Sequence, residues 1–370
     1  MLSLECVTER KEIKMKKVKK YLSEVANNIT PYQWEEGVTE KALRFDANTM
    51  PFPPKCMDDF LDNLKINCPI NEYADPAYTK LKQLIAKYES VNPEMITVTN
   101  SSDEAIDILA KVFLNPGDYF ITTPPTYEMF TIQCEINRGV MLPVPLKKET
   151  WEVDSKEIIK KSRQPKVKLI FLVNPNNPTT SIIPEETVEN IVNKSDAIVV
   201  VDEVYREFCG KSAVPLLKKY KNLVILRSFS KFAALAGARI GYLIADKKLS
   251  EKFDAIRFPM GVSFLSYKLA EKVLENDKNW IKQQTNMTIR ERKRLTNELT
   301  KLGFFVYPSF ANFLLVKVGK TAADLCQKLR QKNIIVRDRS SKKYLEGCIR
   351  ITVRSKNEND QLLKTLEEIL

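Results

Sequence analysis

The sequence of 370 residues contains no histidine. This absence excludes a Ser-His-Asp or Cys-His nucleophile and every metal or haem site that needs a histidine ligand. A general base must therefore be Lys, Asp, Glu, Tyr, Cys or a cofactor. Glycine is also scarce, at 10 residues. Neither G-x-G-x-x-G nor G-x-x-x-x-G-K-[ST] occurs, so nucleotide binding by a glycine-rich loop lacks its usual support.

Membrane and secretion signals are absent as well. No run approaches the roughly 18 apolar residues of a membrane span, and the N-terminus lacks the apolar core of a secretory signal. The seven cysteines are widely spaced and never form C-x-x-C, which is typical of free thiols in a reducing compartment. We therefore expect a cytoplasmic protein with no metal site and no membrane contact.

The charge is strongly basic, at +12 from 59 basic and 47 acidic residues. The basic residues are spread along the chain, and the one dense cluster, Lys11 to Lys20, contains Ile13, Met15 and Val18 at near-helical spacing. This pattern predicts an amphipathic helix over 10–28. A solvated, lysine-rich surface explains the charge better than nucleic-acid binding does.

The apolar patterns predict two domains behind an N-terminal arm. Residues 29–75 are rich in proline and are expected to be irregular. From residue 76 short β-rich runs alternate with helical patterns, which favours an α/β unit with a mainly parallel sheet. The expected boundaries are 1–48 for the helix and arm, 49–260 for a large domain and 261–370 for a small α+β domain.

Strands are expected at 96–99, 119–123, 140–144, 168–173, 197–202, 222–228 and 242–245, and helices at 77–88, 103–114, 126–136, 184–194 and 249–257. Beyond 260, a helical pattern over 263–302 is expected to break near 276–278, with strands at 304–307, 313–318, 334–337 and 348–353 and helices at 321–332 and 357–369.

A lysine after an apolar strand is the first candidate for chemistry. Lys231 ends the segment Ser228-Phe229-Ser230-Lys231, and Arg239 lies eight residues further on. Burial and a neighbouring cation would lower the pKa of such a lysine and make its amine able to form an imine. The hydroxyls and the arginine would suit a phosphate group. By itself, the pattern also fits a surface lysine.

Three further segments carry polar residues where strands end or helices begin. Asp202 ends the apolar run AIVVVD and precedes Tyr205, so it needs a cationic partner or serves as a helix cap. The loop 174–179, NPNNPT, follows another apolar run, at the place where α/β proteins bind ligands. Ser101, Ser102 and Asp103 open a helix, which makes a phosphate cradle or an ordinary cap.

Together these segments resemble, in the same order along the chain, the fold-type I aminotransferases that depend on pyridoxal phosphate (PLP). Within them the chain is most similar to the histidinol-phosphate aminotransferase group, from about Pro31 to the C-terminus. The resemblance implies a three-layer α/β/α large domain, a PLP cofactor, small amino-acid and keto or aldehyde substrates, and a homodimer with shared active sites. The amino donor is expected to be glutamate, and the acceptor imidazole-acetol phosphate.

The resemblance also implies roles for individual residues. Lys231 would bind PLP covalently and move a proton, Asp202 would pair with the pyridine nitrogen, and Asn177 and Tyr205 would hydrogen-bond the ring oxygen. Tyr127 would stack on the ring, with a core aromatic as the alternative. The expected phosphate ligands are Ser102 and Asp103, largely through their backbone N–H groups, and Ser228, Ser230 and Arg239, together with Tyr73 from the partner subunit. The expected substrate ligands are Asn48, Tyr32, Arg337 and Arg350, with Arg350 on the donor's carboxylate.

The chain departs from the family pattern at three positions. Thr180 and Ser101 stand where glycines are usual, and Asn48-Thr49-Met50-Pro51 replaces N-E-N-P. Three alternatives to an aminotransferase stay open. They are a decarboxylase of an amino-acid phosphate similar to threonine-phosphate decarboxylase, a PLP-binding regulator that uses the basic surface, and an inactive relative. The short segment before Pro31 disfavours the regulator, and the intact Lys231 disfavours the inactive relative.

Overall fold

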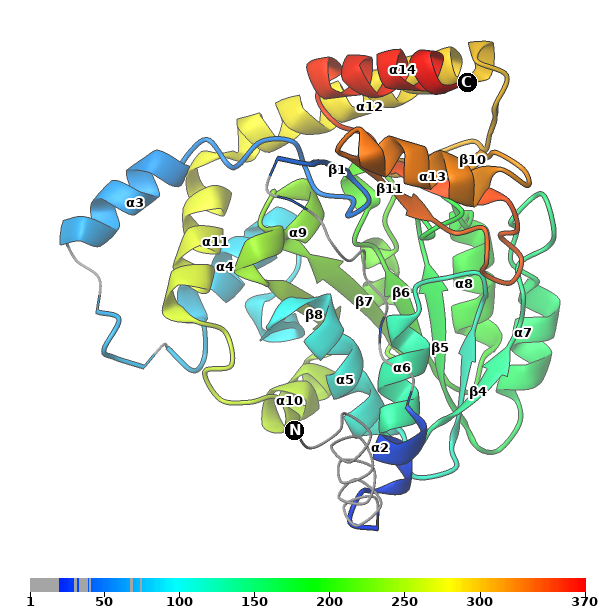
Figure 1. Ribbon diagram of the computed structural model, residues 1–370. Helices are drawn as coiled ribbons and strands as arrows, with labels where there is room; N and C mark the ends of the chain where they lie inside the picture. The colour runs from blue at the N-terminus through cyan, green and yellow to red at the C-terminus, as the bar shows by residue number, and fades with distance from the viewer. Residues whose placement is uncertain (1–19, 30–31, 33–38, 40, 67–68, 74) are drawn as a thin grey trace, which may run out of the picture.

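The computed structural model shows two β-sheets, each with helices packed against it (Figure 1). The structure describes residues 20–29, 32, 39, 41–66, 69–73 and 75–370. Within these residues, no helix has the length and apolar character needed to cross a membrane. In the same part of the chain, no cluster of three His, Cys, Asp or Glu side chains could hold a metal ion.

The larger sheet has seven strands in the order β2-β8-β7-β6-β5-β3-β4. Strand β8 is antiparallel to β2 and β7, and all other neighbours are parallel. The apolar central strands are buried, as expected for a parallel sheet covered on both faces. The strands are β2 (Ile96–Thr99), β3 (Tyr119–Thr122), β4 (Val140–Pro143), β5 (Val167–Val173), β6 (Ile198–Asp202), β7 (Leu223–Ser228) and β8 (Gly241–Ala245).

Helices cover both faces of this sheet, because successive residues of a buried strand point to opposite sides. Val199 and Val201 pack in one core with four helices, namely α4 (Thr79–Glu89), α7 (Ser155–Ser162), α8 (Glu185–Lys194) and α11 (Phe264–Asn276). Val200 packs in the opposite core with α5 (Ser101–Phe113), α6 (Met129–Ile136) and α10 (Lys247–Ile256). These three layers confirm the predicted α/β fold class with a mainly parallel sheet.

The smaller sheet has five strands in the order β1-β11-β12-β10-β9. Three helices cover one of its faces through a leucine-rich core, and the other face carries charged side chains. The strands are β1 (Leu43–Phe45), β9 (Phe305–Val306), β10 (Phe313–Lys317), β11 (Ile334–Asp338) and β12 (Cys348–Thr352), and the helices are α12 (Lys278–Lys301), α13 (Ala322–Gln331) and α14 (Lys356–Ile369).

Sequence patterns located most of these elements. The expected strands of both sheets are present within one to three residues, and the long helical pattern breaks at Asp277 between α11 and α12. The side chain of Asp277 accepts a hydrogen bond from the Cys56 backbone N–H, 2.8 Å away, which holds this break in place. The domain boundaries at residues 48 and 260 stay a prediction.

The expectation that residues 29–75 are irregular is wrong. This segment contains β1, which pairs in parallel with β11, and the helix α3 (Met57–Ile66). The edge of the small sheet supplies the hydrogen bonds that make three residues a strand, and no local pattern shows this. The helix expected over 10–28 lies mostly outside the described residues, which show α2 (Glu24–Asn28) at its end. Helix α7 was not expected. The short remaining elements are η1 (Pro93–Met95), η2 (Arg206–Phe208), η3 (Val214–Lys218), α9 (Phe229–Phe232) and η4 (Ala236–Ala238).

Candidate active site

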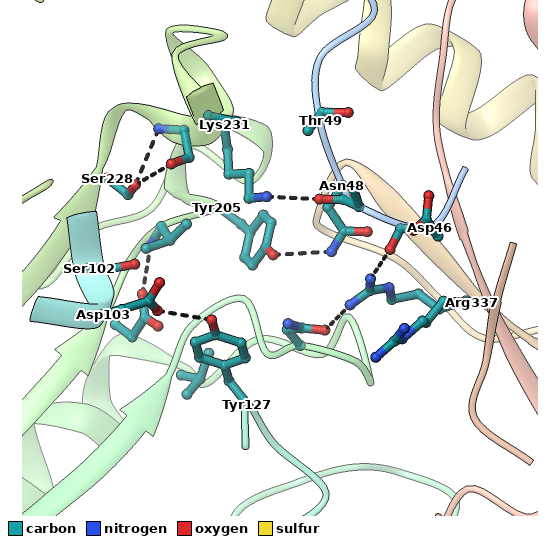
Figure 2. Close-up of a pocket in the computed structure, with 18 of the residues that line it drawn as sticks. Asp46, Asn48, Thr49, Ser102, Asp103, Tyr127, Tyr205, Ser228, Lys231 and Arg337 are labelled. Atoms are coloured by element: carbon teal, nitrogen blue, oxygen red, sulfur yellow. Dashed lines mark hydrogen bonds between the residues drawn. The ribbon is translucent and has the colours of Figure 1, made fainter. Parts of the chain in front are cut away.

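A pocket with a volume of about 500 Å³ lies where strands β5, β6 and β7 end and the charged face of the small sheet begins. Its size is that of a typical small-molecule site. The sequence-predicted residues that line it come from widely separated parts of the chain. They are Tyr32, Asn48, Ser102, Asp103, Tyr127, Asn177, Asp202, Tyr205, Ser228, Ser230, Lys231, Arg239, Arg337 and Arg350. Figure 2 shows the labelled members of this set pointing toward a common space.

Lys231 lies in the single turn of α9, just after β7, where the Ser228 hydroxyl accepts a hydrogen bond from the Ser230 N–H and caps the turn. The Lys231 Nζ donates to the backbone carbonyl of Ala47 at 3.0 Å (Figure 2). Burial, followed by the nearby positive charges of Arg350 and Arg239, lowers the pKa of Lys231 to about 7. Near neutral pH a large fraction of this amine is therefore an unprotonated nucleophile.

Asp202 is the last residue of β6 and is buried at the base of the pocket. Its Oδ1 accepts a hydrogen bond from the Val204 N–H at 3.0 Å. Burial raises the pKa of Asp202 to about 7, even though that hydrogen bond favours the charged form. A cationic partner in the pocket would restore the charge of this carboxylate.

A group of anion-binding donors lines another side of the pocket. The N-terminus of α5 presents Ser102 and Asp103, beside the Ser228 and Ser230 hydroxyls and the guanidinium of Arg239. Arg239 Nη2 lies 2.6 Å from an oxygen of Asp103. Helix N-termini, hydroxyls and arginine are the groups that bind phosphate in proteins.

Gly241 allows this cradle to form. It lies in β8, and a Cβ there would stand 2.6 Å from the carbonyl carbon of Ser101, so any side chain would push the first turn of α5 away.

Tyr127 is fixed on the same side, because its hydroxyl donates to Asp103 Oδ1 at 2.9 Å (Figure 2). Its ring also packs edge-on against Phe130. Tyr127 therefore packs in the core and also lines the pocket, the two alternatives that the sequence pattern left open.

The opposite wall carries two arginines from adjacent strands of the small sheet. Arg337 in β11 stands directly across from Arg350 in β12. Arg350 Nη1 donates to Asn177 Oδ1 at 2.8 Å, and its Nη2 donates to the Asp46 carbonyl. Its buried Nε has no protein partner. Burial, then the positive charge of Arg339, lowers the pKa of Arg350 to about 10, so an anion at this wall would be strongly favoured.

The N-terminal arm contributes residues that the sequence did not indicate. Arg44, Asp46 and Ala47 line the pocket, and Arg44 forms a bidentate pair with Asp46 at 2.7 and 2.8 Å. The alternation of side chains along 43–46 was the available signal, but it is too short to be distinctive. Beside them, Asn48 Nδ2 donates to the Tyr205 hydroxyl at 3.1 Å.

One predicted residue lies elsewhere. Tyr73 is 87 % exposed and does not line the pocket of its own chain. The prediction assigns this tyrosine to the partner subunit's site, so its role depends on a second copy of the chain.

Four residues in or next to the pocket-lining segments have left-handed backbone conformations. Asn48, Ser101, Thr180 and Arg239 have φ angles of 53°, 72°, 64° and 53°. Two of them, Ser101 and Thr180, stand where the family pattern has glycine, the residue that adopts this conformation most easily. Strain of this kind persists only where surrounding contacts hold it.

The pocket fits pyridoxal phosphate by the chemistry of its donors. Lys231 offers an amine, Asp202 a buried carboxylate that forms no ion pair among the described residues, and the cradle closed by Gly241 a place for a phosphate. Tyr205 and Asn177 offer a hydroxyl and an amide between these points. Each polar group of the cofactor therefore has a matching residue.

Comparisons with known proteins agree with this pocket. The family model described as aminotransferase class I and II matches residues 40–366. A histidinol-phosphate aminotransferase of Thermoanaerobacter pseudethanolicus is 39% identical over 331 residues, which are 88% of this chain and 93% of the relative. The crystal structure of the histidinol-phosphate aminotransferase from Clostridium acetobutylicum has a TM-score of 0.80 at 25% identity and covers 88% of this chain and 98% of its own. The enzyme of the same name from Sinorhizobium meliloti, in complex with pyridoxal-5'-phosphate, shares the fold with a TM-score of 0.85 at 24% identity, over 94% and 98% of the two chains.

Proposed function

Since this chain belongs to the aminotransferase class I and II family and is a PLP-dependent aminotransferase, we propose that it transfers an amino group between glutamate and imidazole-acetol phosphate. The product of that transfer is histidinol phosphate. The names of the relatives at 36–39% identity support this substrate, and they favour transamination over the decarboxylation that the sequence left open.

One observation carries the proposal. The buried Lys231 and the buried Asp202 line the same pocket, and both have pKa values of about 7. PLP chemistry requires two groups from a protein, namely a neutral amine and a carboxylate that can pair with a cation. When bound, PLP supplies an electron sink for the charge that develops at the substrate Cα.

The residues around the pocket then have the following proposed roles. Asp202 would keep the pyridine nitrogen protonated. Asn177 and Tyr205 would form hydrogen bonds with the ring oxygen. Lys231 Nζ would act as the base that takes up and returns the proton of the substrate Cα. Tyr127 covers one face of the ring. Ser102, Asp103, Ser228, Ser230 and Arg239 hold the phosphate.

The two facing arginines suit a substrate with two anionic groups. We assign Arg350 to the α-carboxylate, because its buried Nε has no protein partner and a guanidinium binds carboxylate in a bidentate way. Arg337, on the adjacent strand, takes the second carboxylate of glutamate or the phosphate of the other substrate. Asn48 and Tyr32 border this region.

A homodimer and a cytoplasmic location are part of the same proposal. Helix α3 projects at the edge of the chain in Figure 1, with Phe60 buried in the core, and the segment after it exposes Ile70 and Tyr73 by 62% and 87%. Exposed apolar groups on a projecting segment support contact with a second copy. Tyr73 would then reach the cofactor phosphate of the partner subunit.

A panel of amino donors and acceptors tests the substrate assignment. Glutamate with imidazole-acetol phosphate is expected to give 2-oxoglutarate and histidinol phosphate, without release of carbon dioxide. Release of carbon dioxide in place of keto acid would replace the proposal with a decarboxylase.

A mixing experiment tests the shared site. Lys231→Ala and Tyr73→Ala chains are each expected to be weakly active, and a mixture that has exchanged subunits should regain activity, because one site of the mixed dimer has both residues intact. Failure to regain activity, with subunit exchange verified by differently tagged chains, would contradict the role of Tyr73.

A further inference from the structure

Thr180 has a backbone conformation that threonine rarely adopts. Its φ angle is 64° and its side chain is fully buried. The left-handed region crowds any side chain, and a β-branched residue there is a genuine outlier. Such a residue persists only where the surrounding structure holds it, and outliers of this kind cluster at functional sites.

Two hydrogen bonds join Thr180 to the segment that leads into β10 of the small sheet. Its Oγ1 donates to the Pro308 carbonyl at 2.8 Å, and the Phe310 N–H donates to the Thr180 carbonyl at 3.2 Å. The same hydroxyl lies 2.5 Å from the carbonyl oxygen of Thr179, so its single hydrogen is shared between two acceptors. A glycine at this position could make only the backbone contact.

The loop that contains Thr180 also carries Asn177, whose Oδ1 accepts a hydrogen bond from Arg350 Nη1 at 2.8 Å. The loop is internally fixed, because the Thr180 N–H donates to the Asn176 carbonyl at 2.9 Å. Arg350 lies in β12, which pairs directly with β10. The loop is therefore attached to the small sheet at two points, one at Asn177 and one at Thr180.

We propose that Thr180 is a positioning residue, whose hydroxyl bond to Pro308 sets where Asn177 lies relative to Arg350. The inference rests on the proposed roles of Asn177 and Arg350 in binding cofactor and carboxylate. Both residues contact one pocket from opposite sheets, so a shift of the loop would change the space in which a carboxylate meets the Arg350 guanidinium.

Three substitutions separate the hydroxyl from the strain. Thr180→Val keeps the branched shape and loses the hydroxyl, Thr180→Ser keeps the hydroxyl, and Thr180→Gly relieves the strain and loses the hydroxyl. The measurement is the Kd of succinate, a dicarboxylate that cannot react, for the PLP-loaded holoenzyme by calorimetry. We expect the valine and glycine variants to bind succinate about fivefold more weakly, the ratio that one ordinary hydrogen bond provides, and the serine variant to bind it as the wild type does.

The matched control is Ser181→Ala, which removes a hydroxyl from the same loop. Ser181 Oγ lies 2.8 Å from Thr179 Oγ1 and makes no contact with the small sheet among the hydrogen bonds of the described residues. The Ser181→Ala variant is expected to bind succinate with the same Kd as the wild type. If Thr180 acts through Asn177, Thr180→Gly should have no further effect on Kd in an Asn177→Ala background.

A merely structural role makes a different prediction. It requires the succinate Kd to worsen in proportion to the loss of stability in urea across the three variants. A glycine variant with near-wild-type stability and weaker binding supports positioning, whereas equal succinate binding in the wild type, glycine and valine variants would overturn it. A wild-type holoenzyme that does not transaminate would overturn the proposed function, and this inference with it.

Discussion

Two clusters of buried ionisable residues lie at strands β6 and β7. The charges of one cluster are paired with each other, and those of the other cluster are not. In the pocket, Asp202 and Lys231 each have a single hydrogen bond to the backbone, and burial moves the pKa values of both to about 7. One residue before Ser228, the side chain of Arg227 is completely buried beside Glu89 and Glu207.

The second cluster keeps its charges because they are paired. Arg227 Nε lies 3.1 Å from Glu89 Oε1, and Arg206 Nη1 lies 2.9 Å from Glu89 Oε2. Burial would lower the pKa of Arg227, but Glu207 and Glu89 raise it well above its ordinary value. Burial would also raise the pKa of Glu89, but Arg227 and Arg206 bring it below the usual range.

The difference shows that burial alone does not decide whether a charged residue is structural or chemical. In the Arg227 cluster the opposite charges are paired with each other, although the buried Oε2 of Glu207 has no hydrogen-bond partner among the described residues. Lys231 and Asp202 form no ion pair in the part of the chain that the structure describes. A ligand with a carbonyl group can therefore react with the Lys231 amine, and its cationic nitrogen can pair with the Asp202 carboxylate.

Lys231→Ala should have the largest effect. We expect the aminotransferase rate to fall by about 10²- to 10⁴-fold or more, because the amine is the proposed base for the Cα proton. The visible absorbance of bound cofactor should shift to that of free PLP, while far-UV circular dichroism stays unchanged. Retention of the wild-type absorbance would show that Lys231 does not bind the cofactor.

Arg227→Met tests the paired cluster. Loss of this guanidinium leaves Glu89 and Glu207 buried without it, so the free energy of unfolding should fall by about 3–5 kcal/mol. Urea denaturation of the cofactor-free protein measures this. Lys231→Met is the matched control, and it should leave stability equal or higher, because it removes a buried amine that forms no ion pair within the described part of the chain. Similar losses in both variants would remove the distinction between the clusters.

The pH dependence of stability should reveal the unpaired cluster. Asp202 has a pKa of about 7 in the folded chain and 3.8 as its ordinary value, so its contribution is present at low pH and is lost as pH rises to 7. Lys231 falls from 10.5 to about 7, so its contribution is regained between pH 7 and 10.5.

The cofactor-free protein should therefore have a stability minimum near pH 7 from these two groups. Each slope is at most about 1.4 kcal/mol per pH unit. Urea denaturation from pH 5 to 9 measures it, as the difference between the wild type and an Asp202→Asn, Lys231→Met double variant. A difference that does not change with pH would contradict the assigned pKa shifts.

Arg239→Gln should have the smallest effect on the fold and a selective effect on the cofactor. The Arg239 side chain is 49% exposed, and its pair with Asp103 at 2.6 Å is partly solvated, so stability should change by less than about 1 kcal/mol. PLP affinity should fall about tenfold, through the loss of a charge-assisted phosphate contact. Fluorescence titration of the cofactor-free protein with PLP measures this, and unchanged affinity would place the phosphate elsewhere.

The sequence located most of the site because its residues mark the ends of strands. Asp202 and Ser228 are the last residues of apolar strands, and parallel strands bring such ends to one edge of a sheet. Arg337 and Arg350 were visible as charges among β-branched residues. Asp46 and Ala47 were missed, because they directly follow β1, a strand that exists only where it pairs with β11.

By itself the sequence predicted an α/β fold with a mainly parallel sheet and excluded histidine chemistry, since these follow from local periodicity and composition, and its resemblance to a family implied the roles of the chemical groups. Only the tertiary structure decided which buried charges are paired. Glu89 and Arg227 meet across 138 residues, and the Thr180 hydroxyl reaches Pro308 across 128. Pairing energies depend on distance in space, and no local pattern in a chain records that distance.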